Sequence, residues 1–142
     1  MKKRIFYTLT TFLWMAFIFY MSSQTAEVSG EQSDAITRRI IGFFIYNPSE
    51  SLVGTIETVI RKMCHFSEYA LLSFLSFKML VSYGLNRKNT LYAVLIAVVY
   101  AVSDEIHQYF IPGRACRLFD IFLDSLGALT GWYITNRFSR KN

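Results

Sequence analysis

The chain has 142 residues, which suggests one domain, and its composition is unusual for a soluble protein. Hydrophobic residues make up 53% of it, aromatic residues 17% and charged residues only 18%, so it is more apolar and less charged than an average soluble domain. The net charge is +5, and the basic residues lie in short clusters beside apolar runs. This placement fits anionic lipid headgroups and argues against a nucleic-acid groove. The sequence has no zinc-type cysteine spacing, Gly-rich phosphate loop or internal repeat.

The first apolar run, residues 5–21, follows a basic cap of Lys2, Lys3 and Arg4. Its 17 residues carry no charge and include seven aromatic residues. At about 1.5 Å per residue, the run just crosses a hydrocarbon layer of about 30 Å once interfacial residues are counted. A cleaved signal peptide is the competing interpretation. The run is bulky, however, and no clear small-x-small cleavage site follows Tyr20, so we predict a retained membrane helix.

The next predicted elements lie in the long polar connection over residues 22–64. The connection is polar as far as Asp34. Residues 35–46 are then amphipathic but too short and too polar to span a membrane, which predicts a helix lying in the interface. The Asn-Pro-Ser-Glu sequence at 47–50 predicts a helix start, with the asparagine as the capping residue and the proline in the first helical position. The second span, about residues 66–83, is expected to continue from this helix.

Two further apolar runs, residues 91–109 and 119–134, predict the third and fourth spans. In the fourth, Gly127 and Gly131 form a Gly-x-x-x-Gly pair, which allows another helix to approach closely. The sequence therefore predicts an all-α integral membrane protein. It would be a single domain over residues 1–142, with four transmembrane helices and an amphipathic interfacial segment between the first and the second.

The distribution of basic residues predicts the orientation of these helices. Three short segments are basic: the N-terminus, the 84–90 turn and the C-terminus. Their residues are Lys2, Lys3, Arg4, Arg87, Lys88, Arg137, Arg140 and Lys141. The positive-inside rule places these segments in the cytoplasm, so the 22–64 connection and the 103–118 loop face outward. We therefore expect a multi-pass protein of the cell membrane with both termini cytoplasmic.

This topology brings four polar groups to one membrane level on the outer side. They are Ser22-Ser23-Gln24, the segment from Arg61 to Tyr69, the segment from Asp104 to Arg114, and the pair Asp120 and Asp124. Helical spacing places Lys62, His65 and Tyr69 on one face, because they are three and seven residues apart. Ionisable groups at the edge of a bilayer are costly unless they are paired, wetted or used, so this cluster is a candidate functional site.

Three interpretations of the cluster stay open: an ion-pair lattice between helices, a ligand or substrate site, and a metal site without any dedicated ligand spacing. In a ligand site, Arg114 and Lys62 would hold a phosphate or carboxylate. His65 would act as acid or base if Glu105 or Asp104 oriented it. The candidate catalytic residues are therefore His65, Glu105 and Asp104. The candidate ligand-binding residues are Lys62, Tyr69, Gln108, Arg114, Asp120, Asp124 and Gln24. No metal ligand and no cofactor is assigned.

Cys64 and Cys116 both fall on the predicted outer side, where disulfides persist. A bridge between them would tie the second span to the loop after the third. Spacing alone does not reveal pairing, so two free cysteines is the default expectation.

Four motifs follow one another in a fixed order along the chain. They are Ser22-Ser23-Gln24, Lys62-x-x-His65-Phe-x-x-Tyr69, Asp104-Glu105-x-x-Gln108-x-Phe110-x-Pro112-Gly113-Arg114 and Asp120-x-x-x-Asp124-x-x-Gly127-x-x-x-Gly131. This ordered set, within about residues 12 to 134, resembles the VanZ-like family. One position departs from the family pattern, in which an asparagine usually stands where this chain has Asp124. The extra acid puts any shared hydrogen-bond pattern at that position in doubt.

The resemblance implies a small multi-helix membrane protein of the cell envelope. The namesake of the family is associated with resistance to teicoplanin-type glycopeptide antibiotics, and most members have no assigned activity. The first functional hypothesis is an envelope protein that binds a lipid headgroup, a lipid-linked wall precursor or a lipoglycopeptide. The second is a membrane-embedded hydrolase or transferase acting on a phospholipid or polyprenyl-phosphate headgroup. A structural or regulatory partner for another membrane protein is the third. The expected partners are membrane lipids, with no nucleic acid, and the oligomeric state stays open.

Overall fold

The computed structural model of the protein describes residues 1–86 and 90–139, and these residues form helices without a β-strand. The helices are α1 (Lys2–Ser22), α2 (Ala26–Gly42), α3 (Glu50–Ser82), α4 (Tyr92–Tyr109) and α5 (Leu118–Ser139). The prediction of an all-α fold is therefore confirmed for the described residues. Four of the basic residues used to predict the orientation lie outside them: Arg87, Lys88, Arg140 and Lys141.

The bounds of α2 correct the sequence prediction. The helix begins at Ala26 rather than at residue 35, because Thr25 caps it: the Thr25 hydroxyl accepts a hydrogen bond from the backbone N–H of Val28 at 3.4 Å. It ends at Gly42, before the apolar residues 43–46, which are exposed and outside the helix. The hydrophobic pattern alone shifted the predicted helix toward its C-terminal end, because the first half of α2 is mostly polar.

The start of α3 also differs by two residues from the prediction. Ser49, not Asn47, is the N-cap, and its hydroxyl accepts a hydrogen bond from the Leu52 N–H at 3.4 Å. Asn47 instead adopts a left-handed conformation, with φ of 58°, which asparagine tolerates better than most residues. From Glu50 the helix continues without interruption for 33 residues to Ser82. The expectation that the second predicted span grows out of a helix starting near Pro48 is confirmed.

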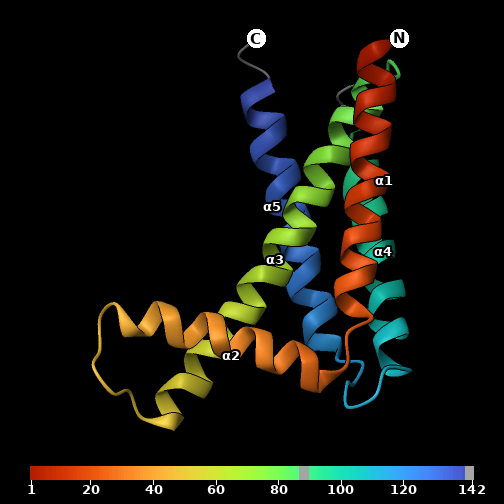
Figure 1. The fold of residues 1–142 in the computed structure, drawn as a ribbon. Coiled ribbons are helices and arrows are strands. Elements are labelled where there is room, and N and C mark those ends of the chain that lie inside the picture. Colours follow the sequence, from red (N-terminus) through yellow and green to blue (C-terminus); the bar gives the residue numbers. More distant parts are fainter. Residues whose placement is uncertain (87–89, 140–142) are drawn as a thin grey trace.

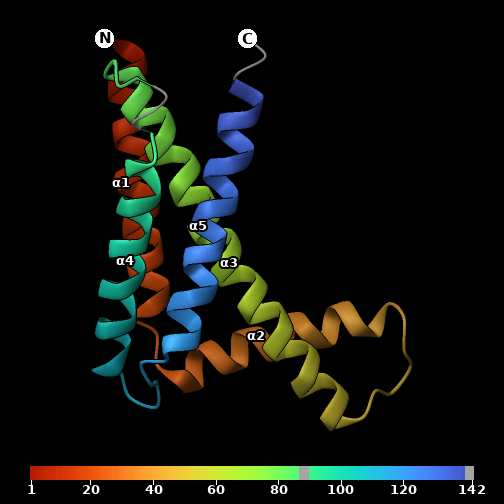
Figure 2. The ribbon, with the colours of Figure 1, turned by 180° about the vertical axis from the view of Figure 1, so that it is seen from behind.

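Helix α3 lies at the centre of the molecule and packs against each of the other four helices. Both ends of the described chain lie at one end of the bundle, together with the end of α3 and the start of α4 (Figure 1). At the opposite end, α2 runs across the bundle, and the connection between α4 and α5 lies beside it (Figure 2). This arrangement places all four predicted polar groups at the α2 end of the molecule.

The closest helix packing in the fold is between α3 and α5. A Cβ atom added at Gly127 would collide with the backbone carbonyl of Phe66, and one added at Gly131 with that of Ala70. The close contact predicted from the Gly-x-x-x-Gly pair is therefore present, and its partner is α3. The hydrophobic core beside it is small: Ile18, Tyr69, Leu72, Ala97, Ala101 and Ala128.

Large apolar side chains cover the outside of the bundle, whereas many of its buried side chains are small or polar. Several large apolar side chains are 59–68% exposed: Phe12, Leu13, Val99, Phe122 and Tyr133. Buried polar residues include Thr11, Ser73, Ser76, Asp104, Glu105, Gln108, Asp124 and Thr135. Such an extensive apolar surface is rare in soluble monomers. By length and composition, α1 is the one helix among the described residues that is apolar enough to cross a membrane.

Candidate functional site

Two neighbouring pockets open at the α2 end of the bundle. The first, of about 170 Å³, lies between α1, α2, α3 and α4 and is lined mainly by carbon atoms; we call it the apolar pocket. The second, of about 290 Å³, lies between α2, α3, the α4–α5 connection and α5 and is rich in cations; we call it the basic pocket. Four residues line both pockets: Ser29, Arg61, His65 and Arg114.

Helix α2 forms part of the wall of both pockets because the α4–α5 connection holds its first turn. The Ala26 N–H donates a hydrogen bond to the Pro112 carbonyl at 3.2 Å. Gly113 follows with a φ of 77°, and a Cβ atom at this position would meet the Ala26 side chain at 2.9 Å. The Pro-Gly break of the sequence is therefore a turn in which Gly113 is required for two reasons: its positive φ angle and the close approach of α2.

The basic pocket contains four basic side chains from two parts of the chain. Arg61 and Lys62 come from α3, and Arg114 and Arg117 come from the α4–α5 connection. The carboxylate in its lining, Asp120, forms an ion pair with Lys62. Even with this pair counted as neutral, Arg61, Arg114 and Arg117 leave an excess of positive charge. Guanidinium groups in this number favour a phosphate or carboxylate ligand.

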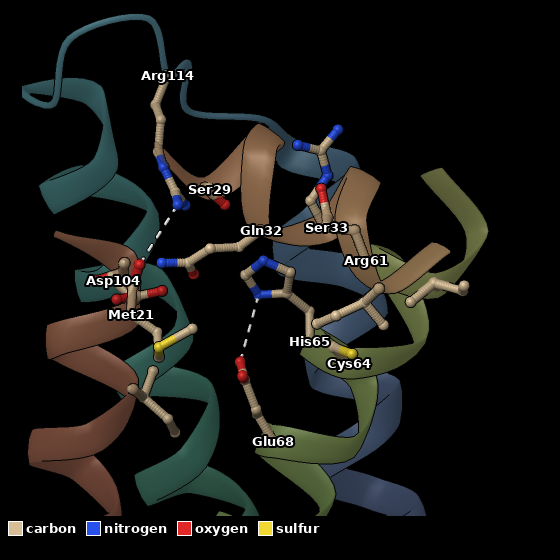
Figure 3. A pocket seen from close by; sticks show the side chains of 14 residues that line it. Met21, Ser29, Gln32, Ser33, Arg61, Cys64, His65, Glu68, Asp104 and Arg114 are labelled. Atoms are coloured by element: carbon tan, nitrogen blue, oxygen red, sulfur yellow. Dashed lines mark hydrogen bonds and ion pairs between the residues drawn. The ribbon is translucent and has the colours of Figure 1, made fainter. Parts of the chain in front are cut away.

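In the apolar pocket, Arg114 and Asp104 face each other. The Arg114 side chain points toward the Asp104 carboxylate, and its Nη2 also donates to the Met21 carbonyl at 3.4 Å (Figure 3). Asp104 is 4% exposed and accepts a hydrogen bond from the Gln108 amide at 3.0 Å on its Oδ2. Its Oδ1 is buried and has no hydrogen bond within the described residues. The Asp104 charge therefore attracts Arg114 across the apolar pocket, although no direct hydrogen bond joins the two side chains within the described residues.

His65 lies in the wall that the two pockets share. Its Nδ1 is 3.8 Å from the Glu68 carboxylate, too far for a hydrogen bond, and it has no other hydrogen-bond partner in the part of the chain described (Figure 3). Burial lowers the pKa of His65 below its usual value, and Arg114 and Arg61 act in the same direction, while Asp104 and Asp120 oppose them. A neutral imidazole is therefore favoured near pH 7.

The other residues singled out from the sequence are distributed around this wall. Tyr69 is fully buried one turn beyond His65, and its hydroxyl has no hydrogen bond among the described residues. Asp124 is 1% exposed, and its Oδ1 is unpaired by the same criterion. Glu105 is buried and accepts a hydrogen bond from the Arg117 N–H at 2.9 Å, which fixes the chain just before α5. Gln24 lines neither pocket, and its amide donates to the Tyr20 carbonyl at 3.4 Å.

The structure also places the acids near His65, the two cysteines and the residues considered for a metal site. Glu68 is the acid nearest to the His65 ring, whereas Glu105 is turned to the Arg117 backbone. Cys64 and Cys116 are free and exposed, and Cys64 lines the apolar pocket while Cys116 lines neither pocket. Burial raises the pKa of the Cys64 thiol, and the charge of Glu68 adds to the effect. Among residues 1–86 and 90–139, no three His, Cys, Asp or Glu side chains gather as a metal site requires.

The sequence reasoning missed the contribution of α2. Ser29, Gln32, Ser33 and Ile36 line the apolar pocket, and Gln32 points into it (Figure 3). These residues are spaced three, four and seven apart and share one helical face, a signal that is visible in the sequence once the helix is known to begin at Ala26. Arg61, Glu68 and Arg117 were also not among the candidate site residues, although all three lie at or near the pockets.

Comparison with known proteins gives a family for the chain. A protein-family model described as VanZ/LLP1 matches residues 6–139, which is nearly the whole chain. No curated protein and no solved structure gave a significant match.

Proposed function

The chain belongs to the VanZ/LLP1 family, and from this premise and the geometry of the two pockets we propose that it is a membrane protein of the cell envelope that binds a ligand with an anionic headgroup. The ligand class is a lipid headgroup, a lipid-linked wall precursor or a lipoglycopeptide. The excess of guanidinium groups in the basic pocket is the observation that carries the proposal. A contribution to glycopeptide resistance would follow from binding such a ligand at the membrane.

The proposal requires the bundle to cross the membrane. In our proposal, α1, residues 66–83 of α3, α4 and α5 are the four spans, and α2 lies in the interface. The apolar exterior and the polar interior of the bundle support this. Because lipid tails are as apolar as the side chains themselves, large apolar side chains gain nothing from burial inside a membrane protein and can face the lipid. The orientation rests on the basic residues: both termini would be cytoplasmic, and both pockets would face outward.

Binding is favoured over catalysis because the pockets offer charge and hydrogen-bond donors, while no described Ser or Cys that lines them is hydrogen-bonded to a histidine. At the end of α1, Ser22 and Ser23 both donate to the Phe19 carbonyl. The Ser23 hydroxyl is also 3.1 Å from His107 Nε2, but Ser23 lines neither pocket. Ser33 donates to the Glu57 carboxylate, which joins α2 to α3. In contrast, Arg61 and Arg117 are exposed and line the basic pocket, so they are accessible to a ligand.

Ligand titration of the purified protein tests this proposal. We expect saturable binding of an anionic phospholipid, and a loss of affinity of about 100-fold or more in an Arg61→Gln, Arg117→Gln double variant, since each of the two charged contacts to phosphate contributes on the order of 1.5–3 kcal/mol. Arg39→Gln is the matched control, because Arg39 is an exposed arginine of α2 that lines neither pocket. An absence of saturable binding to anionic lipids, wall precursors and lipoglycopeptides would overturn the proposal.

A hydrolase or transferase acting on a phospholipid or polyprenyl-phosphate headgroup is the second candidate. The observation in its favour is His65, a largely buried imidazole beside Glu68 in the wall between the pockets. As a general acid or base it would serve a phosphate held by Arg61, Arg114 and Arg117. Lipid and wall-precursor analysis of cells with the wild-type protein, a His65→Gln variant and no protein separates the two candidates. A product pool that depends on His65 supports the enzyme, and equal pools in all three strains exclude it.

A further inference from the structure

The two pockets, which meet at His65, differ in the polarity of the side chains that line them. On one side, the residues that line only the apolar pocket include Ile18, Met21, Ile36, Ile60 and Cys64. On the other side, the residues that line only the basic pocket include Lys62, Arg117 and Asp120. The two pockets adjoin at Ser29, Arg61, His65 and Arg114, which line both of them.

Neither pocket alone has the size of a usual small-molecule site. Sites for drug-sized ligands occupy about 300–1,000 Å³. The apolar pocket has about 170 Å³ and the basic pocket about 290 Å³, so each falls below this range and the two together fall inside it. A ligand that fills the site therefore extends through both pockets.

We propose that one amphiphile occupies both pockets, with a phosphate in the basic pocket and the first part of its hydrocarbon chain in the apolar pocket. This inference rests on the proposed binding function and deepens it, because it specifies the ligand as a phosphate ester on a hydrocarbon chain. Arg61, Arg114 and Arg117 hold the phosphate, and Ile36 and Ile60 contact the chain. The ester linkage between them then passes His65 and Ser29.

The separation of charge from apolar surface makes this orientation the favourable one. Placing the chain in the basic pocket would remove water from guanidinium groups without giving them a partner, which is costly. Arg61 and Arg114 line both pockets, so the remaining residues decide where a phosphate is favoured. The apolar pocket adds the Asp104 and Glu68 carboxylates, which repel a phosphate, whereas the basic pocket adds Arg117, which attracts it. A glycerophospholipid and a polyprenyl phosphate share the required chemistry, since each carries a phosphate on an apolar chain.

The protein carries its own probe for this arrangement. Cys64 is exposed in the apolar pocket, and Cys116 is exposed outside both pockets. The rate at which N-ethylmaleimide alkylates each thiol can be followed by peptide mass spectrometry in digitonin, which has no flexible alkyl chain to compete. The added ligands are inorganic phosphate, dodecyl phosphate and farnesyl phosphate, so that free phosphate, a saturated chain and an isoprenoid chain are compared.

We expect dodecyl phosphate or farnesyl phosphate to slow the alkylation of Cys64 in proportion to occupancy, with no change at Cys116, and inorganic phosphate to leave both rates unchanged. The favoured chain phosphate should also bind about 100-fold more tightly than inorganic phosphate, since several methylene groups leave water. Ile36→Trp, which fills the apolar pocket, should remove this advantage. Ile40→Trp is the control, because Ile40 lies one turn further along α2, is also exposed and lines neither pocket.

The outcomes separate the inference from the proposed function. If both chain phosphates bind with the affinity of inorganic phosphate and Cys64 stays reactive, the single-amphiphile arrangement is wrong and the anion-binding function stands. If none of the three ligands binds but an anionic wall precursor does, the ligand is not a simple chain phosphate and the inference again fails alone. Failure of every anionic ligand overturns both.

Discussion

The Lys62 ammonium on α3 is paired with the Asp120 carboxylate in the first turn of α5. The two residues are 58 positions apart in the sequence, and both side chains are partly buried, at 32% and 23% exposure. The ammonium also lies over the Phe119 ring, 4.8 Å from its centroid. Lys62 of the basic pocket thus joins α3 to α5. Ligand binding in this pocket is therefore expected to depend mainly on its three arginines, Arg61, Arg114 and Arg117.

Removing this pair should destabilise the fold. We expect Lys62→Gln to lower the free energy of unfolding by about 1–2 kcal/mol, because a partly buried charged hydrogen bond is lost. Asp120→Asn should cost slightly more, since the Asp120 charge also interacts favourably with the N-terminus of α5. Denaturant titration of the two single variants and the double variant gives the coupling energy. Additive effects of the two substitutions would show that the pair contributes nothing.

The contact between α3 and α5 should not tolerate a methyl group. Gly127→Ala and Gly131→Ala each place a Cβ atom against a backbone carbonyl of α3, at Phe66 and Ala70, and a backbone cannot move aside as a flexible side chain does. Overpacking of this kind costs on the order of 1–3 kcal/mol or more. A fall in the thermal midpoint of each variant is the expected result.

Gly54 provides the control for that experiment. It also lies inside a helix, α3, but a Cβ atom there would meet nothing within 4 Å. Gly54→Ala should therefore stabilise the protein by about 0.5–1 kcal/mol through the lower helix propensity of glycine. If all three alanine variants behaved alike, propensity rather than close packing would decide the effect.

The buried imidazole of His65 predicts a dependence of stability on pH. The charged groups that face His65 are Glu68, Asp104, Asp120, Arg61 and Arg114. Because the pKa of His65 in the folded protein lies below its usual value of 6.5, the unfolded chain binds more protons between these two pKa values. Stability therefore increases as pH rises through this window and is lost as pH falls through it.

A His65→Gln variant isolates this contribution. Between about pH 7.5 and pH 5.5, the thermal midpoint of the wild type should fall more steeply than that of the variant, because glutamine does not titrate in the range spanned by histidine. Equal pH slopes for the two proteins would mean that the His65 pKa is not lowered by folding.

Arg38 joins α2 to the start of α3. Its guanidinium donates to Asp34 on α2 at 2.9 Å and to Glu50 on α3 at 2.6 Å, and the second contact closes the 43–49 connection. Both interactions are exposed, so their effect on global stability should be small. Their local effect should be visible, since they hold the ends of a loop together.

We therefore expect Arg38→Ala to accelerate amide hydrogen exchange in the last turn of α2 and the first turn of α3. Arg39→Ala is the matched control, because Arg39 is its exposed neighbour on the same helix. Equal exchange in the two variants would show that the Arg38 contacts do not restrain this end of the molecule.

Local patterns in the sequence determined most of the helical architecture. Residues 5–21, 66–83, 91–109 and 119–134 fall within or almost within α1, α3, α4 and α5, because apolar runs and their breakers act over a few residues. The Gly127 and Gly131 spacing predicted a close helix contact for the same reason. The pattern could not name the partner helix, since the contact with Phe66 and Ala70 depends on how two distant segments pack.

The candidate site was predicted only in outline. The sequence placed Lys62, His65, Asp104 and Arg114 at one level, since helix lengths fix where polar residues lie along the bundle. Only the tertiary structure decided that Lys62 pairs with Asp120 and that α2 completes the apolar pocket. The physical reason is that the sequence records spacing along each helix, whereas the rotation and tilt of one helix against another determine which side chains meet.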